Sequence, residues 1–168
     1  MRNLTADLEH KRAVFAADGA HVSKLKIFLS DGTSANVLYR VMNACSKKSW
    51  LLPFALLAQY LNKLLNQCVI GIKADFGPGF VLMHPVGVII NSKVRGGKNV
   101  VLESGVVIGD NHGQSPTLED DIFVGSGAKV FGKLNIGSHA RIGANAVVTR
   151  SVEEGQTVVG IPARPLER

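Results

Sequence analysis

The feature that most constrains this chain is an apolar residue at every sixth position from Ile70 to Val148. Thirteen of the fourteen positions in this row are large and apolar, and His112 is the exception. A period of six fits neither an α-helix, which repeats about every 3.6 residues, nor a plain strand, which repeats every two. It is typical of a parallel β-helix, in which each repeat is a short strand followed by a turn. The sequence therefore predicts stacked coils with the row inside.

The alternative to a β-helix is a sandwich of short strands. Turns in a sandwich recur about every 8–12 residues rather than at a fixed six, so the spacing favours the β-helix. The pattern weakens only between Ile108 and Ile122, where Gly, Asp, Asn and Pro gather. We expect a loop to leave the coils there, with the six-residue phase kept by its length.

The part of the chain before the row has helical spacing. Helices are expected over residues 3–17, over residues 34–46 with Ser34 as N-cap, and over residues 50–67 with Pro53 in the first turn. The third is apolar nearly all round, so we expect it to be buried against the other helices or a neighbouring subunit, or to lie on a membrane surface.

These patterns divide the chain into a helical segment, residues 1–67, and a β-helix domain with a C-terminal extension, residues 68–168. The helical segment holds nine Lys or Arg and four Asp or Glu, against ten and nine in the rest. This basic excess could attract a glycan, a phospholipid surface or a nucleic acid, but no nucleic-acid motif accompanies it, so we expect no nucleic-acid partner. The two cysteines lack disulfide or metal spacing and no apolar leader opens the chain, so we expect a cytoplasmic protein.

Two short motifs accompany the six-residue repeat and bear on function. One is the His-Pro pair at 84–85, within the stretch 82–91, and the other is Gly-Ile-Pro-Ala-Arg at 160–164. Over about residues 36–165 the chain resembles the hexapeptide-repeat acyltransferases, in the serine acetyltransferase-like branch that includes O-acetyltransferases of bacterial surface polysaccharides. The resemblance implies a left-handed parallel β-helix, acetyl-CoA as co-substrate, no metal, and a homotrimer or a pair of trimers.

The resemblance also implies that His84 is the general base. A hydroxyl is a poor nucleophile near pH 7, and an imidazole can take its proton as it attacks the thioester. The candidates for a carboxylate that orients His84 are Glu103, one coil later, and Asp75. For both, a solvated surface carboxylate is the alternative, and for His84 it is a simple turn residue.

Small and basic residues of the later coils are the expected acetyl-CoA site. A small side chain lets the pantetheine arm lie close to the backbone, and Arg164 could meet a phosphate. The positions implied are Gly109, Gly127, Ala128, Gly143, Ala144 and Arg164. In the loop, Asn111 and His112 are candidate contacts to the acceptor substrate. The alternatives are a flexible loop residue for His112 and a solvated tail residue for Arg164.

Three departures from the serine enzymes of this family bear on the acceptor. Their catalytic His is held by an Asp fifteen residues earlier, which here is Val69; an Asp precedes the His, where this chain has Met83; and an Arg-His pair is replaced by Gln114-Ser115. These differences favour a sugar hydroxyl, of a surface polysaccharide or its precursor. The alternatives are a serine O-acetyltransferase of cysteine biosynthesis, for which a C-terminal Ile tail would speak where this chain ends Leu-Glu-Arg, and a non-enzymatic β-helix scaffold.

Overall fold

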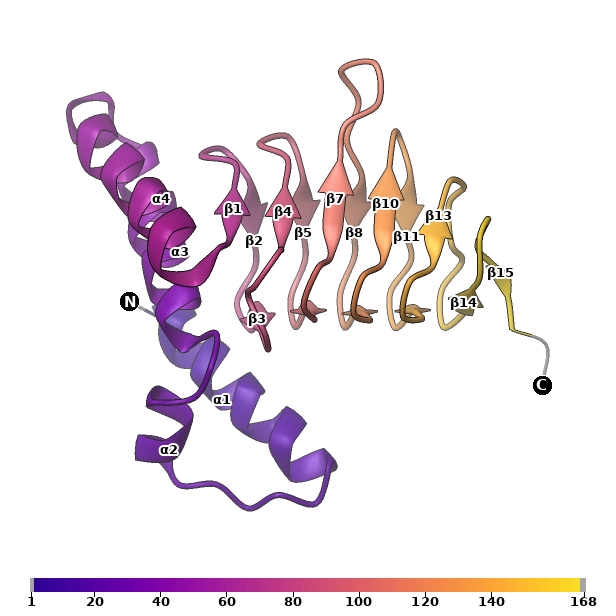
Figure 1. Ribbon diagram of the computed structural model, residues 1–168, viewed down its shortest axis with the longest axis horizontal. Coiled ribbons are helices and arrows are strands. Elements are labelled where there is room, and N and C mark those ends of the chain that lie inside the picture. The colour runs from indigo at the N-terminus through magenta and orange to yellow at the C-terminus, as the bar shows by residue number, and fades with distance from the viewer. Residues whose placement is uncertain (1, 167–168) are drawn as a thin grey trace.

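The computed structural model describes residues 2–166 and shows a helical segment followed by a three-sided β-helix (Figure 1). Residues 1, 167 and 168, which are the outer ends of the two expected domains, lie outside this description. The helices are α1 (Arg2–Ala17), α2 (Lys24–Phe28), α3 (Thr33–Ser46) and α4 (Leu52–Asn66), with the 3-10 turn η1 (Ser49–Leu51) before α4.

The short strands stack into three sheets, one on each face of a prism. Face A holds β1 (Val69–Ile70), β4 (Ile89–Ile90), β7 (Val107–Gly109), β10 (Lys129–Phe131) and β13 (Val147–Val148). Face B holds β2 (Asp75–Phe76), β5 (Arg95–Gly96), β8 (Thr117–Leu118) and β11 (Asn135–Ile136). Face C holds β3 (Val81–Leu82), β6 (Val101–Leu102), β9 (Phe123–Val124), β12 (Arg141–Ile142), β14 (Thr157–Val159) and β15 (Arg164–Pro165). The predicted parallel β-helix is confirmed, and β15 runs antiparallel to β14 at its end.

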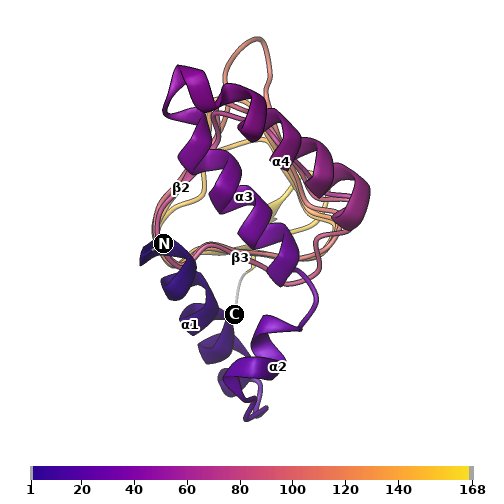
Figure 2. The ribbon, with the colours of Figure 1, turned by 90° about the vertical axis from the view of Figure 1, so that its left-hand side faces the viewer.

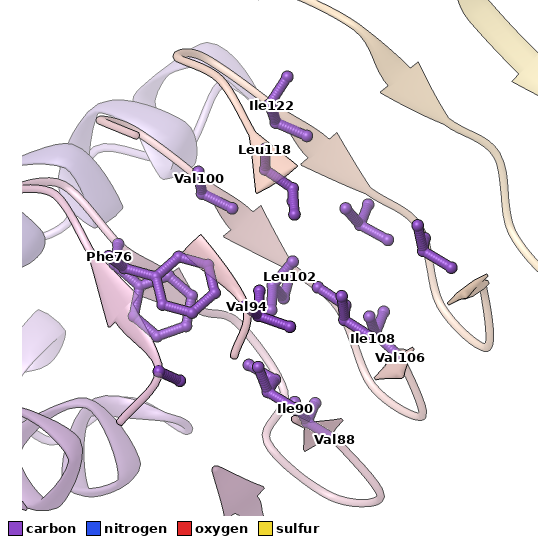
Figure 3. Packing of buried hydrophobic residues seen from close by; sticks show 14 of the residues in the cluster. Phe76, Val88, Ile90, Val94, Val100, Leu102, Val106, Ile108, Leu118 and Ile122 are labelled. Carbon is purple, nitrogen blue, oxygen red and sulfur yellow. The ribbon is translucent and has the colours of Figure 1, made fainter. Parts of the chain in front are cut away.

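Apolar side chains from successive coils fill the inside of the prism. Ile90, Leu102, Ile108 and Leu118 are each at most 2% exposed, and Figure 3 shows such side chains stacked coil upon coil. Burial of apolar surface at about 25 cal/mol per Å² is the main force that holds a prism of two-residue strands together.

The six-residue phase is not kept through the loop, in contrast to our expectation. Strand β4 starts eight residues after β3, because the corner at 85–87 adds two residues, and β8 starts ten after β7, because the loop adds four. Between these two insertions, the inward-pointing residues of the strands include Ile90, Leu102 and Ile108 rather than the predicted positions. The predicted positions, Val88, Val94, Val100 and Val106, each lie two residues before an inward-pointing strand position. They are also fully buried, so the apolar repeat continues in the sequence. The two additions together make six, which restores the phase at Leu118.

Helices α3 and α4 lie across the open end of the first coil (Figure 2). Tyr39 of α3 packs edge-on against Phe76 and Phe80, with ring centroids 6.1 and 5.1 Å apart. Arg40 forms a two-pronged ion pair with Asp7 of α1, at 2.7 and 2.8 Å, and also donates to the carbonyl oxygens of Phe76 and Gly77. Side-chain hydrogen bonds therefore attach the helical segment to the prism, in addition to the peptide chain that connects the two.

The ends and the outer surface of the helices differ from our expectations. Gly32, with φ 77°, is the N-cap of α3, and the Ser34 hydroxyl instead donates to Asn66 Oδ1 at 2.6 Å. Helix α4 is not buried: its inward side is small or polar, and its large apolar side chains are exposed. These exposed residues are Leu52, Phe54, Leu56, Leu57, Tyr60, Leu64 and Leu65. None of the helices that the structure describes has the length and apolarity needed to cross a bilayer.

Candidate active site

His84 lies at the corner where the chain turns from β3 on face C to β4 on face A. Its side chain is 59% exposed, and Nδ1 is 2.9 Å from Oδ2 of Asp31. An ionised carboxylate has no hydrogen to donate, so Nδ1 carries the proton of this bond and the neutral ring keeps its lone pair on Nε2. The imidazole is thus accessible to solvent and arranged to accept a proton through Nε2.

The carboxylate beside His84 was not among those that the sequence indicated. Asp31 lies in the turn between α2 and α3, 53 residues earlier in the chain. Asp75 lies on face B and accepts from Asn43 Nδ2 at 3.0 Å, so our expectation that it could orient His84 is corrected. Glu103 does lie at the right corner, next to Met83 in the register of β3 and β6. Among the described residues, the His84 side chain bonds to Asp31 and not to Glu103.

Most of the residues expected to hold acetyl-CoA lie along the same edge of the prism as His84. The register of β3, β6, β9 and β12 puts Gly127, Gly143 and Ala144 at the corners of the later coils, and Arg164, which pairs with Val159, at the far end. Gly127, Gly143 and Ala144 have small side chains or none, so they add little bulk to this edge. Ala128 is an exception, because its side chain is fully buried and only its backbone could meet a ligand.

The remaining candidates lie at another edge, between faces A and B. Gly109 ends β7, and Asn111 and His112 follow it in the loop that projects from the prism between β7 and β8 (Figure 1). Backbone bonds between Asn111 and Gln114, at 2.8 and 3.1 Å, close the loop, and His112 is exposed at φ 51°. His112 therefore does not occupy the core position that the row would give it. Within one chain, these residues are separated from His84 by the width of face A.

A groove runs along face C, under the second half of α1, and reaches Met83, the residue before His84. It is lined by residues that include Val14, Met83, Val101, Glu103, Phe123 and Arg141.

The structure offers neither a cysteine nucleophile at Cys68 nor a metal site among the described residues. Burial raises the pKa of the Cys68 thiol to about 12 and keeps it protonated. Within residues 2–166, no three His, Cys, Asp or Glu side chains gather as a metal site requires.

Comparison with known proteins gives the family. None of the protein-family models compared with the chain matches it. The serine acetyltransferase of Synechococcus elongatus is 36% identical over 177 residues, covering 99% of this chain and 69% of its own length. That of Helicobacter pylori strain J99 is 32% identical and covers 100% of this chain and 99% of its own length. The chain belongs to the serine acetyltransferase family.

Solved structures agree with this assignment. A serine O-acetyltransferase from Brucella melitensis has a TM-score of 0.87 at 27% identity over 97% of this chain, which spans 65% of that protein. A serine acetyltransferase in complex with CoA and the soybean serine acetyltransferase complexed with serine have the same TM-score, at 26% and 28% identity, and this chain covers 68% of each. The predicted left-handed hexapeptide β-helix and the predicted class, the acetyl-CoA-dependent O-acetyltransferases, are confirmed at the level of the family.

The expected acceptor is corrected by the same comparisons. The sequence favoured a sugar hydroxyl of a surface polysaccharide as the acceptor, with serine as the alternative. The relatives that match nearly the whole chain are serine acetyltransferases, so the polysaccharide interpretation is wrong and the alternative is favoured. One basis of the polysaccharide interpretation was Val69, which stands where the serine enzymes of this family were expected to have the carboxylate that holds the catalytic His. The contact from Asp31 to His84 weakens that argument, since a carboxylate reaches the ring from another direction.

Proposed function

We propose that this protein transfers the acetyl group of acetyl-CoA to the hydroxyl of L-serine, with His84 as the general base. The observation that carries the proposal is the exposed His84 ring, whose Nδ1 is bonded to Asp31 and whose Nε2 has no hydrogen-bond partner among residues 2–166. The serine acetyltransferase relatives, with one neighbour solved with CoA and another with serine, support this choice of substrates.

The reaction needs only one proton acceptor from the chain. Nε2 of His84 takes the hydroxyl proton while the serine oxygen bonds to the thioester carbon. The carbon–sulfur bond then breaks, and the proton passes from His84 to the departing CoA thiolate. Backbone N–H groups at the corners of the coils are the candidate donors to the carbonyl oxygen as it gains negative charge.

We further propose that the active enzyme is a homotrimer, with a pair of trimers as its larger form. Two observations support assembly. The loop with Asn111 and His112 lies at a different edge of the prism from His84, so only a second copy could bring the two together. The exposed apolar side chains of α4 also form a surface of the kind that subunits bury.

Release of CoA thiol from acetyl-CoA and L-serine tests the proposal. We expect His84→Ala to lower kcat/KM by roughly 10²- to 10⁴-fold, the range for loss of a general base. His139→Ala is the matched control, because His139 is an exposed residue at a corner between faces B and C and should leave activity unchanged. Binding of CoA without serine turnover would contradict the assigned acceptor. Absence of CoA binding in calorimetry would favour the scaffold alternative.

A further inference from the structure

We infer that Asp31, supplied by the helical segment, is a positioning residue that fixes the tautomer and the orientation of His84. This inference rests on the proposed role of His84 as general base. It adds a residue outside the β-helix to the machinery of the reaction.

The two oxygens of the Asp31 carboxylate have separate partners. Oδ2 accepts from His84 Nδ1 at 2.9 Å, and Oδ1 accepts the backbone N–H of Gly32 at 3.0 Å. The second bond fixes the plane of the carboxylate relative to its own turn. Asp31 is therefore oriented before His84 meets it, which distinguishes this contact from a pair of free side chains on a surface.

The turn that carries Asp31 is pressed against the strand that carries His84. Gly32 packs so closely on β3 that a Cβ there would overlap the Leu82 carbonyl oxygen, and its φ of 77° suits glycine. One turn into α3, Asn36 Nδ2 donates to the Phe80 carbonyl at 2.8 Å, and Leu82 N–H donates to Asn36 Oδ1 at 3.0 Å. The Asn36 side chain thus pairs with the free edge of β3, two residues before His84.

Lys11 holds the same turn from the inside. Its Nζ donates to the Asp31 carbonyl oxygen and, at 3.2 Å, to Thr33 Oγ1, and the side chain is only 1% exposed. Thr33 Oγ1 donates in turn to the Ile27 carbonyl at 2.8 Å. With bonds on both sides, the turn has little freedom to move Asp31 away from the ring.

The consequence for the reaction is twofold. The neutral ring is held as the Nδ1–H tautomer, so the lone pair on Nε2 faces the acceptor hydroxyl. When Nε2 has taken the proton, the Asp31 carboxylate stabilises the imidazolium charge through Nδ1. Both effects act on the chemical step rather than on the binding of either substrate.

Kinetics of three Asp31 variants test the inference in turnover. We expect Asp31→Ala and Asp31→Asn to lower kcat roughly tenfold or more with KM for both substrates nearly unchanged, as a part of the general-base contribution. Asp31→Glu should recover part of kcat, because it restores a carboxylate near the ring. Glu9→Gln, at an exposed acidic residue of α1, is the control and should behave as wild type. Equal kcat in all variants would overturn the inference, and so would a rise in KM alone.

Nitrogen-15 NMR of the His84 ring gives a readout that does not depend on turnover. In the wild type with a neutral ring, we expect a protonated Nδ1 and an unprotonated Nε2, and in Asp31→Ala a shift toward the Nε2–H form. Resonances unchanged by Asp31→Ala would refute positioning even in a fully active enzyme. Conversely, the expected shift together with absent serine turnover would leave the inference intact and contradict only the proposed function.

Discussion

A buried lysine lies behind the turn that carries Asp31. Lys11 is 1% exposed, and burial lowers the pKa of its ammonium group from 10.5 to about 8, while the nearby Asp31 charge raises it in part. A lysine in such a place costs stability when charged, which the hydrogen bonds to Asp31 and Thr33 offset. The proton of Lys11 is thereby linked to the stability of the fold.

This linkage predicts a difference in pH dependence between the wild type and Lys11→Met. Below pH 8 the folded and unfolded chains both hold the Lys11 proton, so the difference in unfolding free energy is flat. Between about pH 8 and 10.5 the folded protein has released it and the unfolded chain has not, so wild-type stability rises relative to the variant by up to about 1.4 kcal/mol per pH unit. Urea unfolding at half-unit intervals measures this. Lys24→Met, at an exposed lysine, should run parallel to wild type, and parallel curves for Lys11→Met would contradict the prediction.

At the scale of elements, buried polar contacts attach the helices to the prism alongside the apolar packing of residues such as Tyr39. Arg40 of α3 reaches Asp7 of α1 and two carbonyl oxygens of the first coil, and Asp7 also accepts the Gly79 N–H at 2.9 Å. Both side chains of the ion pair are largely buried, at 9% and 1% exposed. A pair of this kind fixes the relative position of three elements.

Removal of one partner should therefore be costly. Asp7→Ala leaves the Arg40 guanidinium buried without its carboxylate, and we expect a loss of about 3–5 kcal/mol in unfolding free energy. The double variant Asp7→Leu with Arg40→Met, which removes both charges, should be considerably more stable than Asp7→Ala. Chemical denaturation of the wild type, Asp7→Ala, the double variant and its two single components, Asp7→Leu and Arg40→Met, decides this. A double variant as unstable as the sum of its two single changes would argue against a coupled pair.

The sequence predicted the elements well where one periodicity governs them and poorly where distant segments meet. The six-residue row predicted the prism, and helical spacing predicted three of the helices, because both depend on local burial. The phase shift at residues 85–87 could not be predicted, because the residues at both possible inward phases, such as Val88 and Ile90, are apolar. Asp31 could not be found in the same way, since the close packing of Gly32 on β3 and the hydrogen bonds of Asn36 to Phe80 and Leu82 bring it to His84. The single signal in the sequence was an Asp-Gly turn before a helix, which is common in proteins of every function.

At the scale of the whole molecule, α4 exposes its large apolar side chains to solvent, which is unusual for a monomeric protein. Ala55, Ala58, Asn62 and Asn66 face inward, while Leu57, Leu64 and the other large residues face outward. The sequence stretch from residue 32 to residue 74 also contains no Asp or Glu. Such a surface is suited to burial against another body, and a second copy of the chain is the occupant that our proposed trimer requires.

Sedimentation velocity tests this surface. We expect the wild type to sediment as a trimer or larger, and Leu57→Asp to shift it toward the monomer, because a carboxylate in a subunit contact is left desolvated. Ile161→Asp, which changes an exposed apolar residue at the far end of the prism, is the control and should leave the assembly intact. A monomeric wild type that floats with anionic vesicles would instead support the expected contact with a membrane surface.

The two extra residues at the corner 85–87 and the four in the loop between β7 and β8 bear on how such a chain can evolve. Strand partners above and below them stay aligned, as Ile90 with Ile108 and Ile108 with Val130, although the connecting peptides differ in length. The corners of the coils can therefore gain or lose residues while the strand register and the packing of the core stay the same. The peptide at 110–116 could therefore be exchanged for another, by evolution or by design, without rebuilding the coils beneath it.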